Sequence, residues 1–291
     1  MTKKSIPKVK DIPVEIVFDD PEKLERGYIA KALVVASLPH SEKEDLVYER
    51  RNGNYVLRIK ADPRYGMPHG VYPRKLLVWM TTEAVRTKSR VLNAGKNQAE
   101  FLRMLGIPRN GPRIKDLRNQ MKRLFSASIS FECSTKNSDI GLNMYPVEKY
   151  ELYWGKNLDE SSMWESTITL SEAFFNELMK SPVVFFLEAL KSLGKSLMGI
   201  DIYLWATYKN SYTTAPTMIK WEDIQAQFGA DYPRDARGRA NFKSKFKAAL
   251  KKVQAIYPEA RSISVQDKGV LFVPGEPHVP KTKELPSKGQ K

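Results

Sequence analysis

The chain has 291 residues, of which 42% are hydrophobic and 28% charged, a composition typical of one large or two ordinary globular domains. Its 48 Lys and Arg residues against 33 Asp and Glu residues give a net charge of +15, which indicates a polyanionic partner. No apolar run is long enough to cross a bilayer, and none follows the basic N-terminus, so the sequence predicts neither a membrane segment nor a signal peptide.

The first part of the chain is expected to contain a basic arm, a helix and a β-hairpin. Residues 1–20 predict a flexible arm, and Asp20-Pro21 predicts the start of a helix. The apolar positions of that helix are Ile29, Leu33 and Val34. Strands at 46–50 and 55–60 flank the sequence RNGN, a strong hairpin signal. Pro73 then begins an apolar helix that we expect in the core.

A compact run follows that has the order of a winged-helix domain. Asn97 and Glu100 have the spacing of a capping box, and the short helix after them ends at Gly106. After a turn rich in proline, a second helix is expected at 113–125. Two strands should follow, at 126–133 and 140–154. Helix, turn, helix and β-hairpin is the winged-helix order.

The same order recurs after a segment at 155–162 that is typical of a linker. Helices are predicted at 171–180 and within 184–210, followed by a short helix at 221–229 that ends in Gly229, like the one before Gly106. A longer helix at 238–254 and a hairpin formed by 262–265 and 270–273 complete the second unit. The sequence therefore predicts an α+β fold of two tandem winged-helix domains, at 21–157 and 158–275, with a disordered tail at 276–291.

The helix at 238–254 is the strongest functional signal. Between Arg237 and Gln254 the chain has seven basic residues and no acidic one. One face forms an apolar stripe of Phe242, Phe246, Ala249, Leu250 and Val253. The opposite face has Asn241, Ser244, Lys247, Ala248 and Lys251, flanked by Lys243 and Lys245. A cationic helix with small residues at its outer surface suits the DNA major groove.

The helix at 113–125 repeats this chemistry. Its inward positions are Ile114, Leu117, Met121 and Leu124, and its outward positions are Lys115, Asn119, Lys122 and Arg123. The alternative is that both helices are ordinary solvated faces of a basic protein. Two such helices, each between a glycine-terminated helix and a hairpin, favour DNA contact. The residues expected to contact DNA are Arg113, Lys115, Asn119, Lys122, Arg123, Arg239, Asn241, Lys243, Ser244, Lys245, Lys247, Lys251 and Lys268.

Signals for catalysis are weak. Gly194-Lys195-Ser196 resembles the end of a phosphate-binding loop, but Ala189 stands where that loop requires glycine. The three histidines are far apart, so no metal-ligand spacing exists. Cys133, the only cysteine, excludes disulfides within the chain, fits a reducing cytoplasm, and is expected to be a buried, inert thiol. We therefore expect a cytoplasmic protein that is not an enzyme and that uses neither cofactor nor metal.

Several segments resemble the RepA-type plasmid replication initiators. They are 70–74 (GVYPR), 82–87 (TEAVRT), 100–102 (EFL), 105–106 (LG), 120–125 (QMKRLF), 201–205 (DIYLW), 227–229 (QFG), 245–247 (KFK), 249–253 (ALKKV) and 257–260 (YPEA). The resemblance implies a protein that binds origin repeats (iterons), opens an adjacent AT-rich region, and recruits the host initiator and the replicative helicase. It also implies a monomer active on iterons and a homodimer that represses its own promoter or inhibits replication.

Two other functions remain open from the sequence. The first is a winged-helix transcriptional repressor without initiation activity. The absence of direct repeats and an AT-rich tract near its gene would favour this function. The second is a rolling-circle nickase, which would cut supercoiled origin DNA in the presence of a divalent metal. In the initiator interpretation, Asn241, Ser244, Lys247 and Lys251 read bases together with Lys115, Asn119 and Arg123. Lys268 contacts either the DNA backbone or the minor groove beside them.

Overall fold

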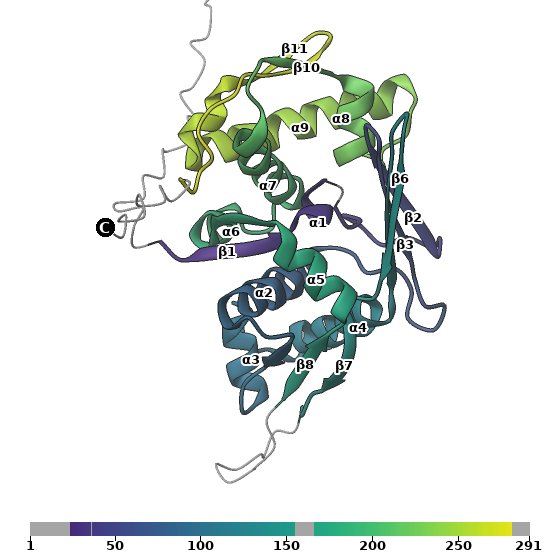
Figure 1. Ribbon diagram of the computed structural model, residues 1–291, viewed down its shortest axis with the longest axis vertical. Helices are drawn as coiled ribbons and strands as arrows, with labels where there is room; N and C mark the ends of the chain where they lie inside the picture. Colours follow the sequence, from purple (N-terminus) through teal and green to yellow (C-terminus); the bar gives the residue numbers. More distant parts are fainter. Residues whose placement is uncertain (1–23, 36, 155–165, 281–291) are drawn as a thin grey trace, which may run out of the picture.

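The computed structural model describes residues 24–35, 37–154 and 166–280. The predicted N-terminal arm, the predicted linker and the tail beyond residue 280 lie outside these ranges. Within them the chain forms nine α-helices, one 3-10 helix and twelve strands in four antiparallel sheets (Figure 1). The expectation of a mixed α+β fold is confirmed.

Figure 1 shows α2, α3 and α4 in the lower part of the molecule and α8 and α9 in the upper part, with α1 and α7 between them. The elements up to residue 154 are β1 (Arg26–Ala30), α1 (Lys31–Val35), β2 (Val47–Asn52), β3 (Tyr55–Lys60), α2 (Val71–Thr87), β4 (Val91–Asn93), α3 (Gln98–Met104), α4 (Gly111–Ser126), β5 (Ser128–Ser134), β6 (Asp139–Met144) and β7 (Val147–Glu151). Those after residue 165 are β8 (Thr167–Leu170), α5 (Glu172–Lys180), β9 (Pro182–Phe186), α6 (Leu187–Leu193), α7 (Leu197–Tyr212), β10 (Thr217–Lys220), α8 (Trp221–Phe228), α9 (Ala236–Ile256), η1 (Pro258–Ser262), β11 (Ile263–Gln266) and β12 (Gly269–Phe272).

The helix pair α3 and α4 begins and ends as its sequence predicts. The Asn97 side chain accepts from the backbone N–H of Glu100 at 3.0 Å, so it caps α3. The Glu100 carboxylate accepts from the backbone N–H of Lys96 at 2.8 Å, one residue earlier than in a standard capping box. Gly106 follows α3 with φ of 57°, a left-handed conformation that favours glycine. The turn then leads to Asn110, whose side chain caps α4.

The predicted hairpin at β2 and β3 is confirmed, and it belongs to a four-stranded sheet in the order β2-β3-β5-β6. The predicted single strand at 140–154 is wrong. The chain breaks at Tyr145-Pro146, so β6 pairs with β5, whereas β7 pairs with β8 in a different sheet. Proline has no backbone N–H to donate to a sheet and therefore marks this change of sheet.

The predicted helix from Asp20-Pro21 through Val34 is wrong for its described residues up to Ala30, whereas Leu33 and Val34 do lie in a helix, α1. Ile29 lies in strand β1, which pairs antiparallel with β9 (Tyr28 opposite Val184), and α1 begins only at Lys31. The sequence of β1 is compatible with a strand as well as with a helix, and its partner β9 lies far along the chain. The pairing therefore depends on tertiary structure and overrides the local preference.

The second unit follows its predicted order of α8, α9 and the hairpin β11–β12, and β10 adds a third strand beside β12. Gly229 ends α8 for a different reason than Gly106 ends α3. Its φ is −129°, and a Cβ there would lie 2.3 Å from the Phe242 ring. Glycine is required at this position because α8 and α9 approach closely, rather than because of a left-handed turn.

Aromatic residues form much of the core, and Trp79, Phe185, Tyr203 and Trp205 are all buried. The start of the predicted disordered tail is packed against this core, which corrects that expectation for residues 276–280. The His278 ring stacks on Tyr257 at a centroid distance of 4.6 Å, and its Nδ1 lies 2.9 Å from the Tyr203 hydroxyl. Burial supplies the order that a polar, proline-containing sequence does not indicate.

Candidate nucleic-acid interface

Helix α9 has one buried and one exposed face. The five residues of the predicted apolar stripe are all buried, with exposures of 5% or less. Opposite them lie the exposed residues Asn241, Ser244, Lys247, Ala248 and Lys251. The Asp235 side chain caps the helix by accepting from the backbone N–H of Gly238 at 2.6 Å. The apolar periodicity thus fixes how the helix rolls on the core, and the roll leaves the basic face in solvent.

Two basic residues of α9 have intramolecular contacts that their sequence does not show. Lys243 is half-buried, and its Nζ lies 5.0 Å from the centre of the Trp221 ring, a cation–π contact. The Arg239 guanidinium donates to the backbone carbonyl of Arg234, although the residue is exposed. Lys245 is exposed and has room to reach a phosphate.

Trp221 joins the hairpin to α9 and was not singled out from the sequence. It is the first residue of α8, and its ring packs edge-on against Phe242 and Phe246 at 6.3 and 5.9 Å. Its Nε1–H donates to the carbonyl of Gln266 at the end of β11, at 3.1 Å. Lys268, in the turn between β11 and β12, is exposed next to this anchored residue. Its position could have identified Trp221 from the sequence, because it is a tryptophan at the start of a short helix that precedes a basic helix.

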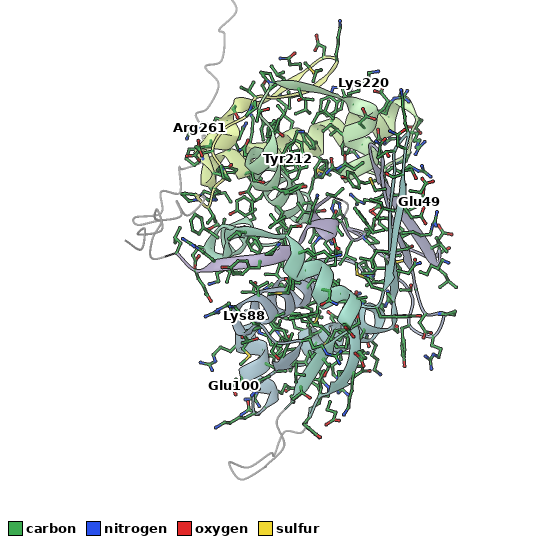
Figure 2. All side chains as sticks on the ribbon, viewed as in Figure 1. Glu49, Lys88, Glu100, Tyr212, Lys220 and Arg261 are labelled. Carbon is green, nitrogen blue, oxygen red and sulfur yellow. The ribbon has the colours of Figure 1, made fainter. Side chains whose placement is uncertain are left out.

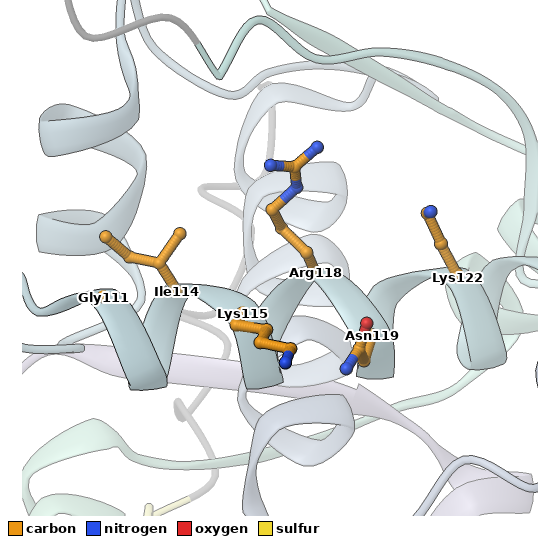
Figure 3. A pocket seen from close by; sticks show the side chains of 6 residues that line it. All are labelled: Gly111, Ile114, Lys115, Arg118, Asn119 and Lys122. Carbon is orange, nitrogen blue, oxygen red and sulfur yellow. The ribbon is translucent and has the colours of Figure 1, made fainter.

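Helix α4 presents a second basic face. Lys115, Asn119 and Lys122 are exposed, as predicted, and Arg113 is half-buried near the start of the helix. A depression follows this face, lined by Gly111, Ile114, Lys115, Arg118, Asn119 and Lys122 (Figure 3). In Figure 3, Arg118 and Lys122 rise from one side of the helix, whereas Lys115 and Asn119 lie along the adjacent side.

Arg118 is a member of this face that the sequence reasoning missed. It is exposed, and its guanidinium carbon lies 5.0 Å from the centre of the Trp154 ring. Its spacing from Lys115 and Lys122, three and four residues, makes it a neighbour of both on the helix surface, and that spacing would have identified it.

Arg123 has several partners within the protein. Its guanidinium pairs with Glu42 at 2.7 Å, donates to the carbonyl of Met67 at 3.2 Å, and lies 3.2 Å from Nδ1 of His69. The side chain is only 20% exposed. The hydrogen bond from Arg123 holds the pKa of the Glu42 carboxyl below its usual range. Helix α4 thus directs this guanidinium toward the loop before α2.

No group of histidine, cysteine and carboxylate side chains in the described residues has the arrangement of a metal site. Gly194 ends α6 with φ of 57°, so the Gly194-Lys195-Ser196 segment is a turn between two helices. Cys133 is half-buried in β5 rather than fully buried as expected. In the ranges that the structure describes, no helix is both long and apolar enough to span a bilayer.

Comparison with known proteins identifies the family to which this chain belongs. The family model described as plasmid encoded RepA protein matches residues 67–222, from the loop before α2 to the start of α8. No curated protein matches the chain significantly. A crystal structure of domains 2 and 3 of RctB matches with a TM-score of 0.52 and 11% identity, covering 83% of this chain and 95% of that one. A second structure of RctB domains 2–3 matches with a TM-score of 0.48 and 10% identity, covering 81% and 85%.

At such low identity the first structural match establishes a shared fold and nothing about function. The family match is of a different kind, since it spans more than half of the chain and includes all of α3 and α4. This protein therefore belongs to the plasmid-encoded RepA family of plasmid replication initiation proteins.

Proposed function

We propose that this RepA-family protein initiates plasmid replication by binding repeated sites in origin DNA through α4 and α9. The observation that carries the proposal is the unneutralised charge of α9. The helix has seven basic residues and no acidic one, and in the described residues no carboxylate lies within salt-bridge distance of them. A surface of this kind attracts the phosphate backbone and releases its counterions on binding.

We infer two tandem winged-helix units, predicted from the sequence at 21–157 and 158–275. Strand β8 lies beyond that boundary but pairs with β4 and β7 of the first unit, so the first unit extends at least to Leu170. In each unit, a short helix precedes the exposed basic helix, and an antiparallel strand pair follows it. In this arrangement the second helix enters the major groove and the hairpin contacts the backbone beside it. Two such helices suit a repeat whose half-sites are about 10 bp apart.

The basic and polar residues of these surfaces divide into two proposed roles. Asn241, Ser244, Lys247 and Lys251 of α9 and Lys115 and Asn119 of α4 read base edges. Arg113, Arg118, Lys122, Arg239, Lys243, Lys245 and Lys268 contact phosphates, with Lys243 sharing its charge with the Trp221 ring. Arg123 is removed from the base readers because of its partners in the protein.

Binding at the repeats would place the protein beside the AT-rich region that must open. Bending and supercoiling stress at flexible steps supply the energy, so opening requires no hydrolytic residue. Recruitment of the host initiator and the replicative helicase, and repression of its own promoter by a homodimer, belong to the same proposal.

Two measurements test the proposal. A footprint on the origin of the protein's own plasmid should show protection of direct repeats next to an AT-rich tract. A plasmid with that origin should replicate only when this protein is supplied. Protection of the promoter alone, without replication, would indicate a repressor, and site-specific nicks in supercoiled origin DNA would indicate an enzyme.

A further inference from the structure

A buried ionic cluster joins the part of the protein that contains α4 to the part that contains α9. Arg74 of α2 and Asp201 of α7 are 7% and 6% exposed. The Arg74 guanidinium donates through Nε to Oδ1 of Asp201 at 3.1 Å and through Nη2 to Oδ2 at 3.0 Å. Its remaining contacts are to the backbone carbonyls of Leu38, Pro39 and Gly70, at 2.7 to 3.0 Å. The fork of the guanidinium is therefore fully used.

The Asp201 carboxylate also binds the segment between α1 and β2. Oδ2 accepts from the Ser37 hydroxyl at 2.5 Å and lies 2.7 Å from Nε2 of His40. Burial raises the pKa of Asp201, but the charge of Arg74 and the bonds from His40 outweigh it, so the pKa lies below its usual range. Three separate stretches of chain thus meet on one ionised carboxylate.

Other contacts support the same boundary. The side chain of Gln227 in α8 donates to the carbonyl of Val35 at 3.2 Å, and Arg50 of β2 donates to the carbonyl of Gln227. Strand β1 pairs with β9 over five residues. Figure 2 shows side chains throughout this central region, between Lys220 and Arg261 above and Lys88 and Glu100 below. The connection is packed rather than hinged.

A buried ion pair is weak evidence for stability, because desolvating two charges offsets much of their attraction. Its best-attested use is to specify one arrangement over others, since any shift of the parts leaves a buried charge without its partner. Here the arrangement being specified is that of the two helices proposed to read DNA; Figure 1 shows α9 above and α4 below α7, the helix that supplies Asp201.

We propose that the joint formed by Arg74, Asp201, His40 and Ser37 fixes the position of α4 relative to α9 and thereby sets the spacing of half-sites that the protein accepts. These are positioning residues that touch no DNA. The inference rests on the proposed function, because it concerns DNA bound by both helices at once. Once one helix is bound, a rigid joint gives the other helix a high effective concentration at its half-site for one spacing and a low one for other spacings. A loose joint lets the protein bind DNA with several spacings.

The test compares DNA spacing and protein geometry in the same variants. Arg74→Met with Asp201→Leu removes the ionic joint without burying an unpaired charge, and Arg74→Lys keeps the charge but loses the fork. Glu177→Gln with Lys180→Gln, an i,i+3 pair within α5, is the matched control with unchanged net charge. Affinity is measured for origin repeats with 0, 1, 2, 3 and 5 inserted base pairs between the half-sites. Spin labels at Met104→Cys and Asp223→Cys, in a Cys133→Ser background, report the distance distribution between α3 and α8 without DNA.

We expect the parent chain and the control to lose about 100-fold in affinity when half a helical turn is inserted, and to give one narrow distance distribution. The Arg74→Met/Asp201→Leu variant should lose less than about 3-fold across the series and give a broad distribution. If that variant does not fold, Arg74→Lys should also show a weaker dependence of affinity on spacing and a broader distance distribution than the parent. If the variant shows the same dependence of affinity on spacing as the parent, or the same narrow distance distribution, the inference is wrong but the proposed function stands. A parent chain that binds no origin repeat overturns the proposed function and this inference with it.

Discussion

The indole Nε1 of Trp221 donates to the carbonyl of Gln266 at 3.1 Å, so the first residue of α8 holds the last residue of β11. The same ring packs against Phe242 and Phe246 on the buried face of α9 and has Lys243 above it. One side chain therefore fixes the position of the hairpin turn that contains Lys268 relative to the basic helix α9. The DNA contacts made by these two elements should be coupled.

Replacing Trp221 with Phe tests this coupling. The change keeps an aromatic ring in the core but removes the hydrogen bond, so we expect a loss of about 1 kcal/mol in stability. Lys268→Ala should weaken origin binding in the parent and have a much smaller effect in Trp221→Phe. The check is a double-mutant cycle by gel shift or fluorescence anisotropy, and strictly additive effects would contradict the coupling.

Reversing charge on the exposed face of α9 should abolish repeat binding. Lys247→Glu with Lys251→Glu changes two side chains that have no salt bridge in the described structure, so the thermal melt should move little. The control is Lys180→Glu with Lys195→Glu, which changes net charge equally at exposed sites outside both basic helices. Equal loss of affinity in the control would mean that total charge, rather than this face, determines binding.

Lys245→Ala should weaken binding to specific and unrelated DNA alike. One lost phosphate contact reduces the slope of log K against log salt by about 0.9. Lys243→Ala should also reduce the slope, but it removes the contact with Trp221 and is expected to cost about 0.5–1 kcal/mol of folding free energy as well. A changed base preference for Lys245→Ala would reassign that residue to base reading.

The stability of the protein should fall in mild acid because of His278. Burial lowers the pKa of His278 to about 4, from 6.5 in the unfolded chain. Below pH 6.5 the unfolded chain binds a proton that the folded one does not, so stability is complete above this pH and is lost as the pH falls toward 4. From these two values we expect a loss of about 2 kcal/mol between pH 7.5 and pH 5.

His278→Phe keeps an aromatic ring against Tyr257 and Phe186 and lacks the titration. Urea unfolding of the two proteins at both pH values isolates the contribution of His278 from that of the other ionisable groups. The same pH dependence in both proteins would show that the partial burial of His278 does not lower its pKa.

Gly229→Ala should destabilise the second unit, because its Cβ would lie 2.3 Å from the Phe242 ring. An overlap of this kind costs about 1–3 kcal/mol. Gly111→Ala, at the start of α4, has no heavy atom within 4 Å of the new Cβ and serves as the control, with little expected change. Calorimetric melting of both variants measures the difference, and equal melting temperatures would contradict the close approach of α8 and α9.

Local patterns were sufficient where a segment chooses its structure from its own residues. The apolar stripe of α9, the Asn97 cap and the Gly53 turn between β2 and β3 all depend on neighbours within a few positions, and each is confirmed. The exposure of Lys247 and Lys251 follows from the same stripe, since burying one face of a helix leaves the opposite face in water. The basic candidate interface on α9 was therefore predictable.

Patterns failed where the partner lies far along the chain. Ile29 was expected in a helix and lies in β1 because β9 is there to pair with it. Arg123 pairs with Glu42 and donates to Met67, partners that no local pattern indicates, because of how α4 packs against the loop before α2. His278, in an expected disordered tail, is ordered by Tyr203 and Tyr257.

The sequence by itself determined that this is a basic α+β protein with two helices suited to DNA, because charge and periodicity are local properties. Only the tertiary structure decided that Trp221 registers the hairpin on α9 and that Arg74 meets Asp201 between the two halves. Each of these contacts joins residues that are distant in sequence. They form because the whole chain must bury its apolar surface while giving every buried polar group a partner.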